Sequence, residues 1–205
     1  MLAIAIWTTL IITSFSAECI AAATAEKTTL PNSHIIAAIP WNQQFNGLSC
    51  GAALLGIVFD YWGPSIGEKE IMNVARSSSM GTWSPDIVRT GHFSYMSDAQ
   101  GSFFPSIGPQ GGFEERQFGY ATFSYSSDEF WLDDLKTLIS NDIPVIVLMN
   151  YYPSGGGGHY RVVIGYDDNQ QLIYFSDPWG RDLNHLTDWS GMISWSYSDF
   201  QMGWN

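Results

Sequence analysis

Three apolar stretches in the last third of the chain limit the possible folds more than any other feature of the sequence. Residues 143–152, IPVIVLMNYY, are typical of a buried strand, as are HYRVVIGY at 159–166 and QLIYFSD at 171–177. A polar turn at 167–170 joins the last two stretches, so we expect them to pair as a β-hairpin. The PSGGGG segment at 153–158 is expected to be a loop that leads into this hairpin.

Helical patterns come before these strands, and this order indicates an α+β fold. The clearest is CGAALLGIVFDYW at 50–62, where Gly63-Pro64 ends the helix. The other expected helices cover residues 68–76, a shorter stretch that starts with Pro85, and a stretch from Ser126 to about Asn141. Further strands are expected at 35–39 and 118–125, and 91–119 is expected to be mostly loop.

Length and charge set further bounds. A chain of 205 residues, of which 45% are hydrophobic, is within the range of one globular domain and can build a core. Twenty acidic against eight basic side chains give a formal net charge of −12, which repels phosphate backbones and anionic lipid headgroups. We therefore expect no nucleic-acid partner.

The first 25 residues have the features of a secretory signal peptide. The run MLAIAIWTTLIITSF is apolar but too short for the ~20 residues of a membrane span, and Ala23-Thr24-Ala25 offers a small-x-small cleavage site. No Lys or Arg precedes the run, so an uncleaved anchor or a misplaced start is the alternative. Cleavage after Ala25 leaves residues 26–205 as one domain, secreted or at the cell surface, with no integral membrane span.

Cys50 is the first candidate for chemistry. Cys19 would leave with the signal peptide, so Cys50 would be the only thiol in the mature chain. A cysteine in the first turn of a helix has its thiolate favoured by unpaired backbone N–H groups and by the helix dipole. The small residues Gly51, Ala52 and Ala53 would let a substrate chain approach closely. The alternative is an inert thiol buried among small core residues.

His159 opens one strand of the hairpin and Asp177 closes the other. An odd-length turn centred on Asp168 would place them opposite each other, with Cβ atoms roughly 5 Å apart. A carboxylate at that separation fixes the tautomer of an imidazole and stabilises the imidazolium, which is the orienting role in a catalytic triad. A two-residue turn would shift the register by one residue. Taken alone, His159 also fits a surface strand, and Asp177-Pro178 a plain turn.

In combination, these motifs resemble the papain-like cysteine peptidases, specifically the branch typified by bacteriocin-leader peptidases and their stand-alone exported relatives. Members of that branch carry a Gln six residues before a Cys-Gly or Cys-Ala pair, a Gly-His strand that ends in Gly-Tyr-Asp, and then Asp-Pro-Trp. Here those motifs are Gln44 with SCGAA, GHYRVVIGYDD and SDPWG. The likeness runs from about residue 35 to the end of the chain.

The resemblance implies a papain-like α+β fold in which the Cys50 helix packs against a mainly antiparallel sheet. It implies a cysteine peptidase that acts on peptide or protein substrates through Cys50, His159 and Asp177 and needs no cofactor. Gln44 would supply a side-chain N–H to the oxyanion hole, together with the backbone N–H of Cys50. Trp179 would cover the hydrogen bond between Asp177 and His159, although core packing is the simpler role for a tryptophan.

The sequence leaves two alternatives to a peptidase open. Papain-like sites also perform amide hydrolysis on cell-wall peptides, acyl transfer and isopeptide exchange, and no motif here describes the cleft that separates these reactions. A binding module is the second alternative, with a sugar or peptide platform formed by Trp189, Trp195, Phe200 and Trp204. A metal site is not expected, because the four histidines include no pair at ligand spacing.

Overall fold

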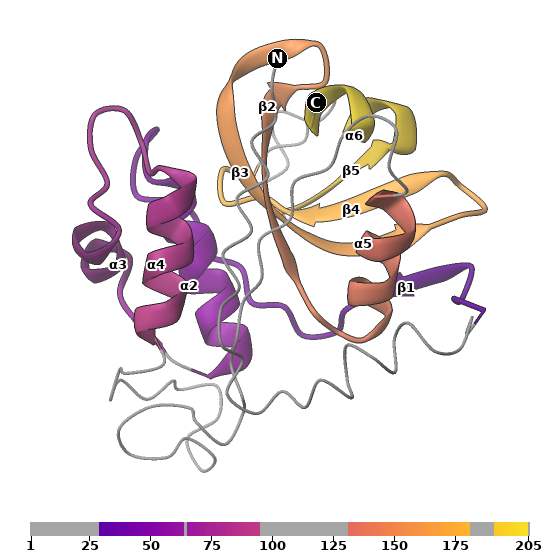
Figure 1. Ribbon diagram of the computed structural model, residues 1–205, viewed down its shortest axis with the longest axis horizontal. Coiled ribbons are helices and arrows are strands. Elements are labelled where there is room, and N and C mark those ends of the chain that lie inside the picture. Colours follow the sequence, from indigo (N-terminus) through magenta and orange to yellow (C-terminus); the bar gives the residue numbers. More distant parts are fainter. Residues whose placement is uncertain (1–28, 64, 95–130, 181–190, 205) are drawn as a thin grey trace.

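The computed structural model describes residues 29–63, 65–94, 131–180 and 191–204 (Figure 1). In chain order its elements are β1 (Ser33–Ile35), α2 (Cys50–Trp62), α3 (Glu68–Val74), α4 (Ser84–Ser94), α5 (Trp131–Ser140), β2 (Val145–Tyr152), β3 (Gly155–Asp167), β4 (Leu172–Ser176), β5 (Met192–Ser196) and α6 (Tyr197–Trp204). Most helices precede the main strands, as the predicted α+β class requires. Among the described helices, none combines the length and apolar character needed to cross a membrane.

The long strand β3 is the centre of the sheet. Along one edge it pairs with β4, and β4 in turn pairs with β5. Along the other edge, β2 pairs with residues 155–163 and β1 with residues 165–167. All of these pairings are antiparallel, so the sheet agrees with the predicted papain-like layout.

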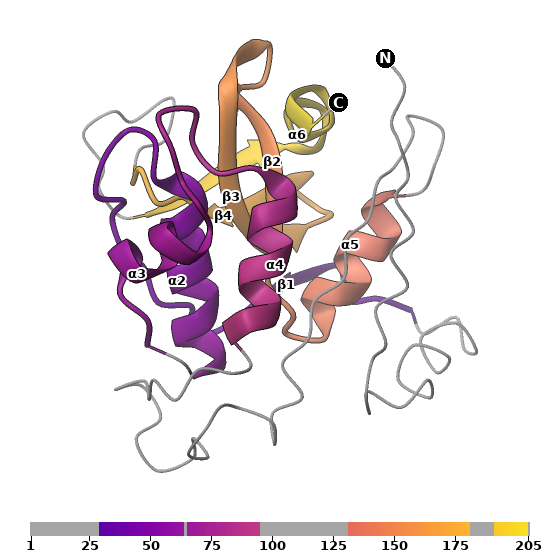
Figure 2. The ribbon, with the colours of Figure 1, turned by 60° about the vertical axis from the view of Figure 1, so that its left-hand side comes forward.

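Both faces of the sheet are covered (Figures 1 and 2). On one face, Tyr160, Val162 and Ile164 of β3 pack in a buried cluster with α2, α3 and α4. On the other face, Val163 and Tyr166 pack in a second cluster with α5 and α6. A strand that is buried on both faces carries an almost continuous apolar run, which explains why YRVVIGY does not alternate between polar and apolar residues.

A β-bulge at Ile164 changes which residues of β3 share a face. The pairing with β4 passes from Val163↔Phe175 to Gly165↔Tyr174, so that one extra residue of β3 lies between two consecutive pairs. Before the bulge, the even-numbered residues of β3 face α2. Beyond the bulge, an even-numbered residue faces α5 and α6 instead.

Three predicted element bounds are corrected. The glycines at 155–158, predicted as loop, form the start of β3, because backbone pairing with β2 outweighs the low strand propensity of glycine. The strand predicted at 35–39 ends at Ile35, since Ala38 turns the chain with a left-handed φ of 59°. α4 is 11 residues long and reaches Ser94, into the predicted loop. The expected strand at 118–125, the capping box at Ser126 and the signal peptide lie outside the described residues.

The aromatic residues near the C-terminus belong to the core. Trp195 is 4% exposed and Phe200 is fully buried, with its ring stacked 5.6 Å from that of Phe175. Trp204 is partly buried against Phe200, at 5.2 Å between ring centroids. Trp189 lies outside the described residues. The predicted alternative of an aromatic binding platform is therefore corrected for Trp195, Phe200 and Trp204, because their rings pack against other core residues.

Gly165 provides a test of this packing. A Cβ at Gly165 would lie 2.8 Å from Cγ1 of Ile35 and 2.9 Å from the backbone oxygen of His34, both on β1. Because that backbone is paired with β3, we expect Gly165→Ala to lower the free energy of unfolding by roughly 1–3 kcal/mol. Gly157→Ala, on the same strand with nothing within 4 Å of its added Cβ, is the matched control and should stay within about 0.5 kcal/mol. Equal urea midpoints for the two variants would contradict this account.

Candidate active site

Cys50 is the first residue of α2 and is 8% exposed. Ser49 precedes it at the N-cap position, but the Ser49 side chain makes no capping hydrogen bond. Its hydroxyl donates to the carbonyl of Asn46 at 3.1 Å and accepts from the Asn46 N–H at 3.0 Å. The first turn of α2 therefore keeps N–H groups that no capping side chain occupies, and these groups favour an anion beside them.

The connection between α3 and α4 packs directly on the start of α2. A Cβ at Gly51 would lie 2.9 Å from Cδ1 of Ile87 and 3.0 Å from Cβ of Thr82, so only glycine allows this approach. The carbonyl of Thr82 accepts a hydrogen bond from the hydroxyl of Tyr160 at 3.0 Å. Because Tyr160 follows His159 on β3, this bond ties the helical half of the site to the strand that carries the histidine.

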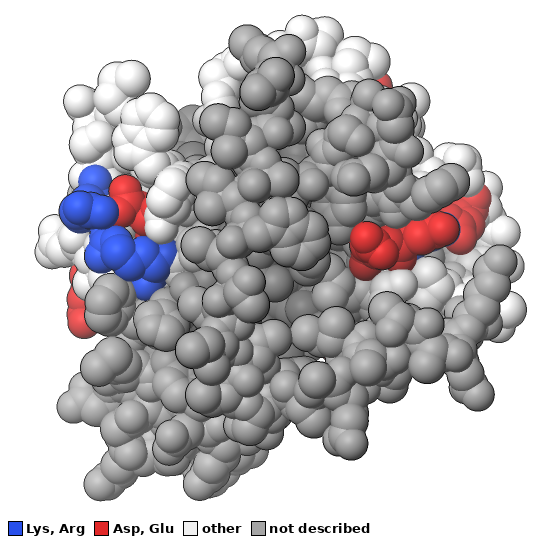
Figure 3. Space-filling model, in the orientation of Figure 1, with Lys and Arg blue, Asp and Glu red and all other residues white. Residues whose placement is uncertain are grey.

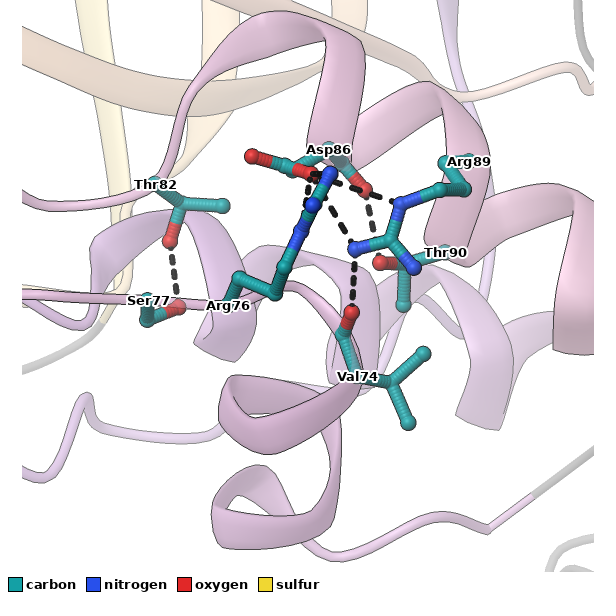
Figure 4. A network of polar contacts seen from close by, with 7 residues as sticks. All are labelled: Val74, Arg76, Ser77, Thr82, Asp86, Arg89 and Thr90. Atoms are coloured by element: carbon teal, nitrogen blue, oxygen red, sulfur yellow. Dashed lines mark hydrogen bonds and ion pairs between the residues drawn. The ribbon is translucent and has the colours of Figure 1, made fainter.

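Two arginines hold α3 and α4 together on the outer side (Figure 4). Oδ1 of Asp86 accepts hydrogen bonds from Arg76 at 2.7 Å and from Arg89 at 3.1 Å, and Arg89 also donates to the carbonyl of Val74. The hydrogen bonds from Arg76 and Arg89 lower the pKa of the Asp86 carboxyl. On the face in Figure 3, the coloured Lys and Arg side chains gather over α3 and α4, and the acidic ones mostly around α5.

His159 and Asp177 meet through a different register from the one predicted. The turn at 168–171 has four residues, and an even-length turn alone would place the two side chains on opposite faces of the sheet. The bulge at Ile164 adds one residue to β3 and brings both back to the same face. The prediction of an odd-length turn centred on Asp168 was therefore wrong.

Asp177 lies level with Arg161 rather than with His159. This follows from continuing the Val162↔Ser176 pairing by one residue, and His159 lies two residues farther along the same face of β3. The Asp177 carboxylate reaches both side chains. Nε2 of His159 lies 2.9 Å from its Oδ1, and Nε of Arg161 donates to its Oδ2 at 2.8 Å.

The backbone around Asp177 is fixed as well. The Asp177 N–H donates to the carbonyl of Gly191 at 2.7 Å, and the Asp177 carbonyl accepts from the indole N–H of Trp41 at 2.8 Å. The backbone N–H of Trp179 donates to Oδ1 of Asp177 at 2.7 Å. Trp179 thus reaches the site through its backbone, while its side chain is partly buried.

The pKa values of the three groups shift in directions that favour charge. Burial raises the pKa of the Cys50 thiol, but the hydrogen bond and charge of His159, with backbone N–H groups of Tyr160 and Gly51, outweigh burial and lower it. Burial opposes the imidazolium of His159, yet its hydrogen bonds with Asp177 and Cys50 raise its pKa. Burial also opposes the Asp177 carboxylate, and His159 and Arg161 overcome it and lower that pKa. The site favours a thiolate, an imidazolium and a carboxylate.

Gln44 lies in the loop before α2 and is 6% exposed. Its backbone N–H donates to the carbonyl of Pro178 at 2.9 Å, which ties this loop to the segment after Asp177. Its side-chain Nε2 donates to the carbonyl of Asn46, and its Oε1 has no hydrogen-bond partner among the described residues. The neighbouring Gln43 is exposed.

Sequence reasoning missed two side chains at this site. Arg161 is 1% exposed and bonds Asp177, and the ring of Tyr151 packs edge-on against that of His159 with centroids 5.2 Å apart. A signal for Arg161 was present, because it is a cation two residues from His159 in an otherwise apolar strand. Tyr151 gave no signal beyond strand propensity.

The described ranges contain no group of three His, Cys, Asp or Glu side chains that could hold a metal ion. His34 instead bonds Oδ1 of Asp142 at 2.8 Å. The ionisable groups that meet at the candidate site are those of Cys50, His159, Asp177 and Arg161.

A helix that begins with a cysteine, next to a histidine and a carboxylate on an antiparallel sheet, is typical of the papain-like cysteine peptidases. Xylellain, a cysteine protease from Xylella fastidiosa, shares the fold: the TM-score is 0.57 over 87% of this chain and 85% of xylellain, at 16% identity. A putative C39-like peptidase from Bacillus anthracis matches with a TM-score of 0.48 at 15% identity, over 84% of this chain and 92% of its own. The peptidase domain of Streptococcus ComA matches at 0.44 and 18% identity, over 77% and 96%.

The comparison of sequences identifies the family of this chain. The sequence model of the Peptidase_C39 like family matches residues 36–203, which is most of the chain. The chain therefore belongs to the Peptidase_C39 like family and is a cysteine peptidase, as the resemblance predicted. Comparison with curated proteins finds no match.

The reactivity of Cys50 tests the electrostatics of the site. Because His159 and the nearby N–H groups lower the thiol pKa, iodoacetamide should label Cys50 at a lower pH than it labels a free cysteine. His159→Ala removes the largest influences that lower the thiol pKa and leaves burial, which raises it, opposed only by the backbone N–H groups of Tyr160 and Gly51. The midpoint of the labelling rate against pH should then rise. A wild-type protein that resists labelling until it is denatured would show that Cys50 is an inert thiol.

Proposed function

We propose that Cys50 is the nucleophile of an exported peptidase, that His159 is its general acid and base, and that Asp177 orients His159. The observation that carries this proposal is the buried pair of His159 and Asp177, with Nε2 of His159 2.9 Å from Oδ1 of Asp177, beside a Cys50 thiol whose pKa His159 lowers. Since Nε2 is engaged with Asp177, Nδ1 is the ring nitrogen left for the thiol. A carboxylate on one ring nitrogen and a thiol on the other is the arrangement that an activated cysteine requires.

In the acylation step, the Cys50 thiolate attacks the carbonyl carbon of the scissile peptide bond and forms a tetrahedral intermediate. The His159 imidazolium donates its proton to the nitrogen of the leaving amine as the C–N bond breaks. The amine product departs, and the acyl group stays on Cys50 as a thioester. Asp177 remains ionised throughout, because its role is to hold the imidazole orientation and to stabilise its positive charge.

In the deacylation step, neutral His159 takes a proton from water while the water oxygen attacks the thioester carbonyl. The C–S bond then breaks, which releases the carboxylic acid and restores the thiolate and imidazolium. The same residue therefore acts as an acid in the first step and as a base in the second.

The negative oxygen of each tetrahedral intermediate requires hydrogen-bond donors. We assign this role to the backbone N–H of Cys50 and the side-chain amide of Gln44. The contact of Gln44 Nε2 with the Asn46 carbonyl supports the assignment, because it fixes which end of the amide is the donor and leaves a second N–H on the same nitrogen. Burial of Gln44 keeps competing water away from that nitrogen.

Export is the part of the proposal that the N-terminal sequence supports. The apolar run before Ala23-Thr24-Ala25 favours cleavage after Ala25, which would release residues 26–205 as the mature enzyme. N-terminal sequencing of the protein recovered from the culture medium is the direct test. Recovery of the intact chain in the membrane fraction alone would favour an uncleaved anchor.

Asp177→Asn tests the orienting role. Asparagine keeps the shape of aspartate but cannot stabilise an imidazolium, so kcat should fall by roughly 10²- to 10⁴-fold. Asp142→Asn, which removes an exposed carboxylate that also bonds a histidine, is the matched control and should leave kcat unchanged. Circular dichroism of both variants monitors the fold. An Asp177→Asn variant with wild-type kcat would remove the carboxylate from the mechanism.

The substrate class requires a parallel assay. The purified mature protein is exposed to a diverse peptide library, a peptidoglycan digest and a set of amine acceptors, with Cys50→Ala as the control in each. We expect cleavage of library peptides that Cys50→Ala abolishes, since peptide-bond hydrolysis is the reaction of the family. Activity confined to the digest or to amine transfer would instead identify an amidase or an acyltransferase.

A further inference from the structure

Arg161 is a buried cation that the mechanism above does not use. It lies on β3 with 1% exposure, two residues after His159 and level with Asp177. An arginine is almost never buried this completely unless its charge is paired, and leaving such a charge unpaired is costly. The groups that pair with Arg161 therefore indicate its role.

The guanidinium of Arg161 is held by Asp177, by β2 and by β5. Its Nε donates to Oδ2 of Asp177 at 2.8 Å, while Nη1 and Nη2 donate to the carbonyls of Asn150 and Tyr151 on β2, at 3.1 and 3.0 Å. Its Cζ lies over the ring of Trp195 on β5, 4.6 Å from the ring centroid. Only a planar, forked donor satisfies all of these contacts together, and a lysine ammonium would not.

The two oxygens of Asp177 are divided among three partners. Oδ1 receives His159 and the N–H of Trp179, and Oδ2 receives Arg161. Rotation of the carboxylate away from His159 would break the bond to Arg161 as well. Because β2 and β5 hold Arg161 in place, Arg161 helps to determine the orientation of the carboxylate that serves His159.

We propose that Arg161 is a positioning residue for the Cys50–His159 pair, which fixes the Asp177 carboxylate on His159 and supplies a permanent positive charge that favours the thiolate. This inference rests on the proposed function of the site. The ionisable groups that face Arg161 are Asp177, Tyr151, Cys50 and His159. Its positive charge attracts the thiolate of Cys50 and repels the imidazolium of His159, so it opposes the protonated forms of both.

Two substitutions separate the two effects. Arg161→Lys keeps the positive charge but loses the planar, forked guanidinium donor. Because the charge is kept, the iodoacetamide-labelling midpoint of Cys50 should stay near that of wild type. Its kcat for the best peptide of the library should nevertheless fall by roughly tenfold or more, with KM little changed, because the Asp177 carboxylate is less well held. Arg161→Met removes the charge as well, so kcat should fall and the labelling midpoint should move to higher pH.

Lys136→Met is the matched control, because Lys136 also pairs with a hairpin aspartate, Asp168, at 2.7 Å and lies over the rings of Tyr166 and Tyr197. This variant should lose stability and keep both the wild-type midpoint and the wild-type kcat. Arg161 variants that lose only melting temperature, as Lys136→Met does, would overturn the proposal. If Arg161→Met fails to fold, Arg161→Lys decides, since a wild-type kcat in that variant contradicts positioning.

The positioning role of Arg161 and the proposed function of the site can fail separately. If wild-type protein cleaves no peptide but labels at low pH, the substrate assignment fails while the effect of Arg161 on the thiolate is still measured by the labelling midpoint. If wild-type protein cleaves peptides and Arg161→Met matches it in kcat and midpoint, the proposed function stands and the positioning role is wrong.

Discussion

The candidate site depends on one buried carboxylate. Asp177 is 1% exposed, and a carboxylate removed from water to this extent is stable only if charges and hydrogen bonds replace its hydration. His159, Arg161 and the backbone N–H of Trp179 provide that replacement. The need to satisfy Asp177 therefore fixes the first half of β3 relative to the end of β4, and the geometry at His159 follows from it.

The two halves of the molecule are joined by polar links in addition to core packing. The indole of Trp41 donates to the Asp177 carbonyl, the backbone N–H of Gln44 donates to the Pro178 carbonyl, and Tyr160 donates to the Thr82 carbonyl. Each link joins the helical half, or the loop that leads to α2, to the β3–β4 hairpin or the segment after it. Hydrogen bonds have narrow distance ranges, so these links set the separation of the thiol and the imidazole more tightly than apolar contacts would.

Much of the fold was predictable because local chemistry dictates it. α2 ends at Trp62 with Gly63 as its C-cap, as expected, and the apolar runs of β2 and β3 cannot be solvated. Features that depend on tertiary contacts were not predictable. The glycines at 155–158 become strand only because β2 is available to pair with them, and nothing in the sequence marks Ile164 as a bulge. The sequence likewise identifies Cys50 and His159 as candidates but does not reveal that Arg161 lies beside Asp177.

The bulge at Ile164 also constrains how the gene can change. The four-residue turn and the bulge each shift the side-chain alternation by one, and the two shifts cancel. An insertion or deletion of a single codon in either place would point the Asp177 side chain away from His159, whereas one such change in each place would leave the pair intact. Among functional descendants of this sequence, length changes between His159 and Asp177 should therefore occur in pairs.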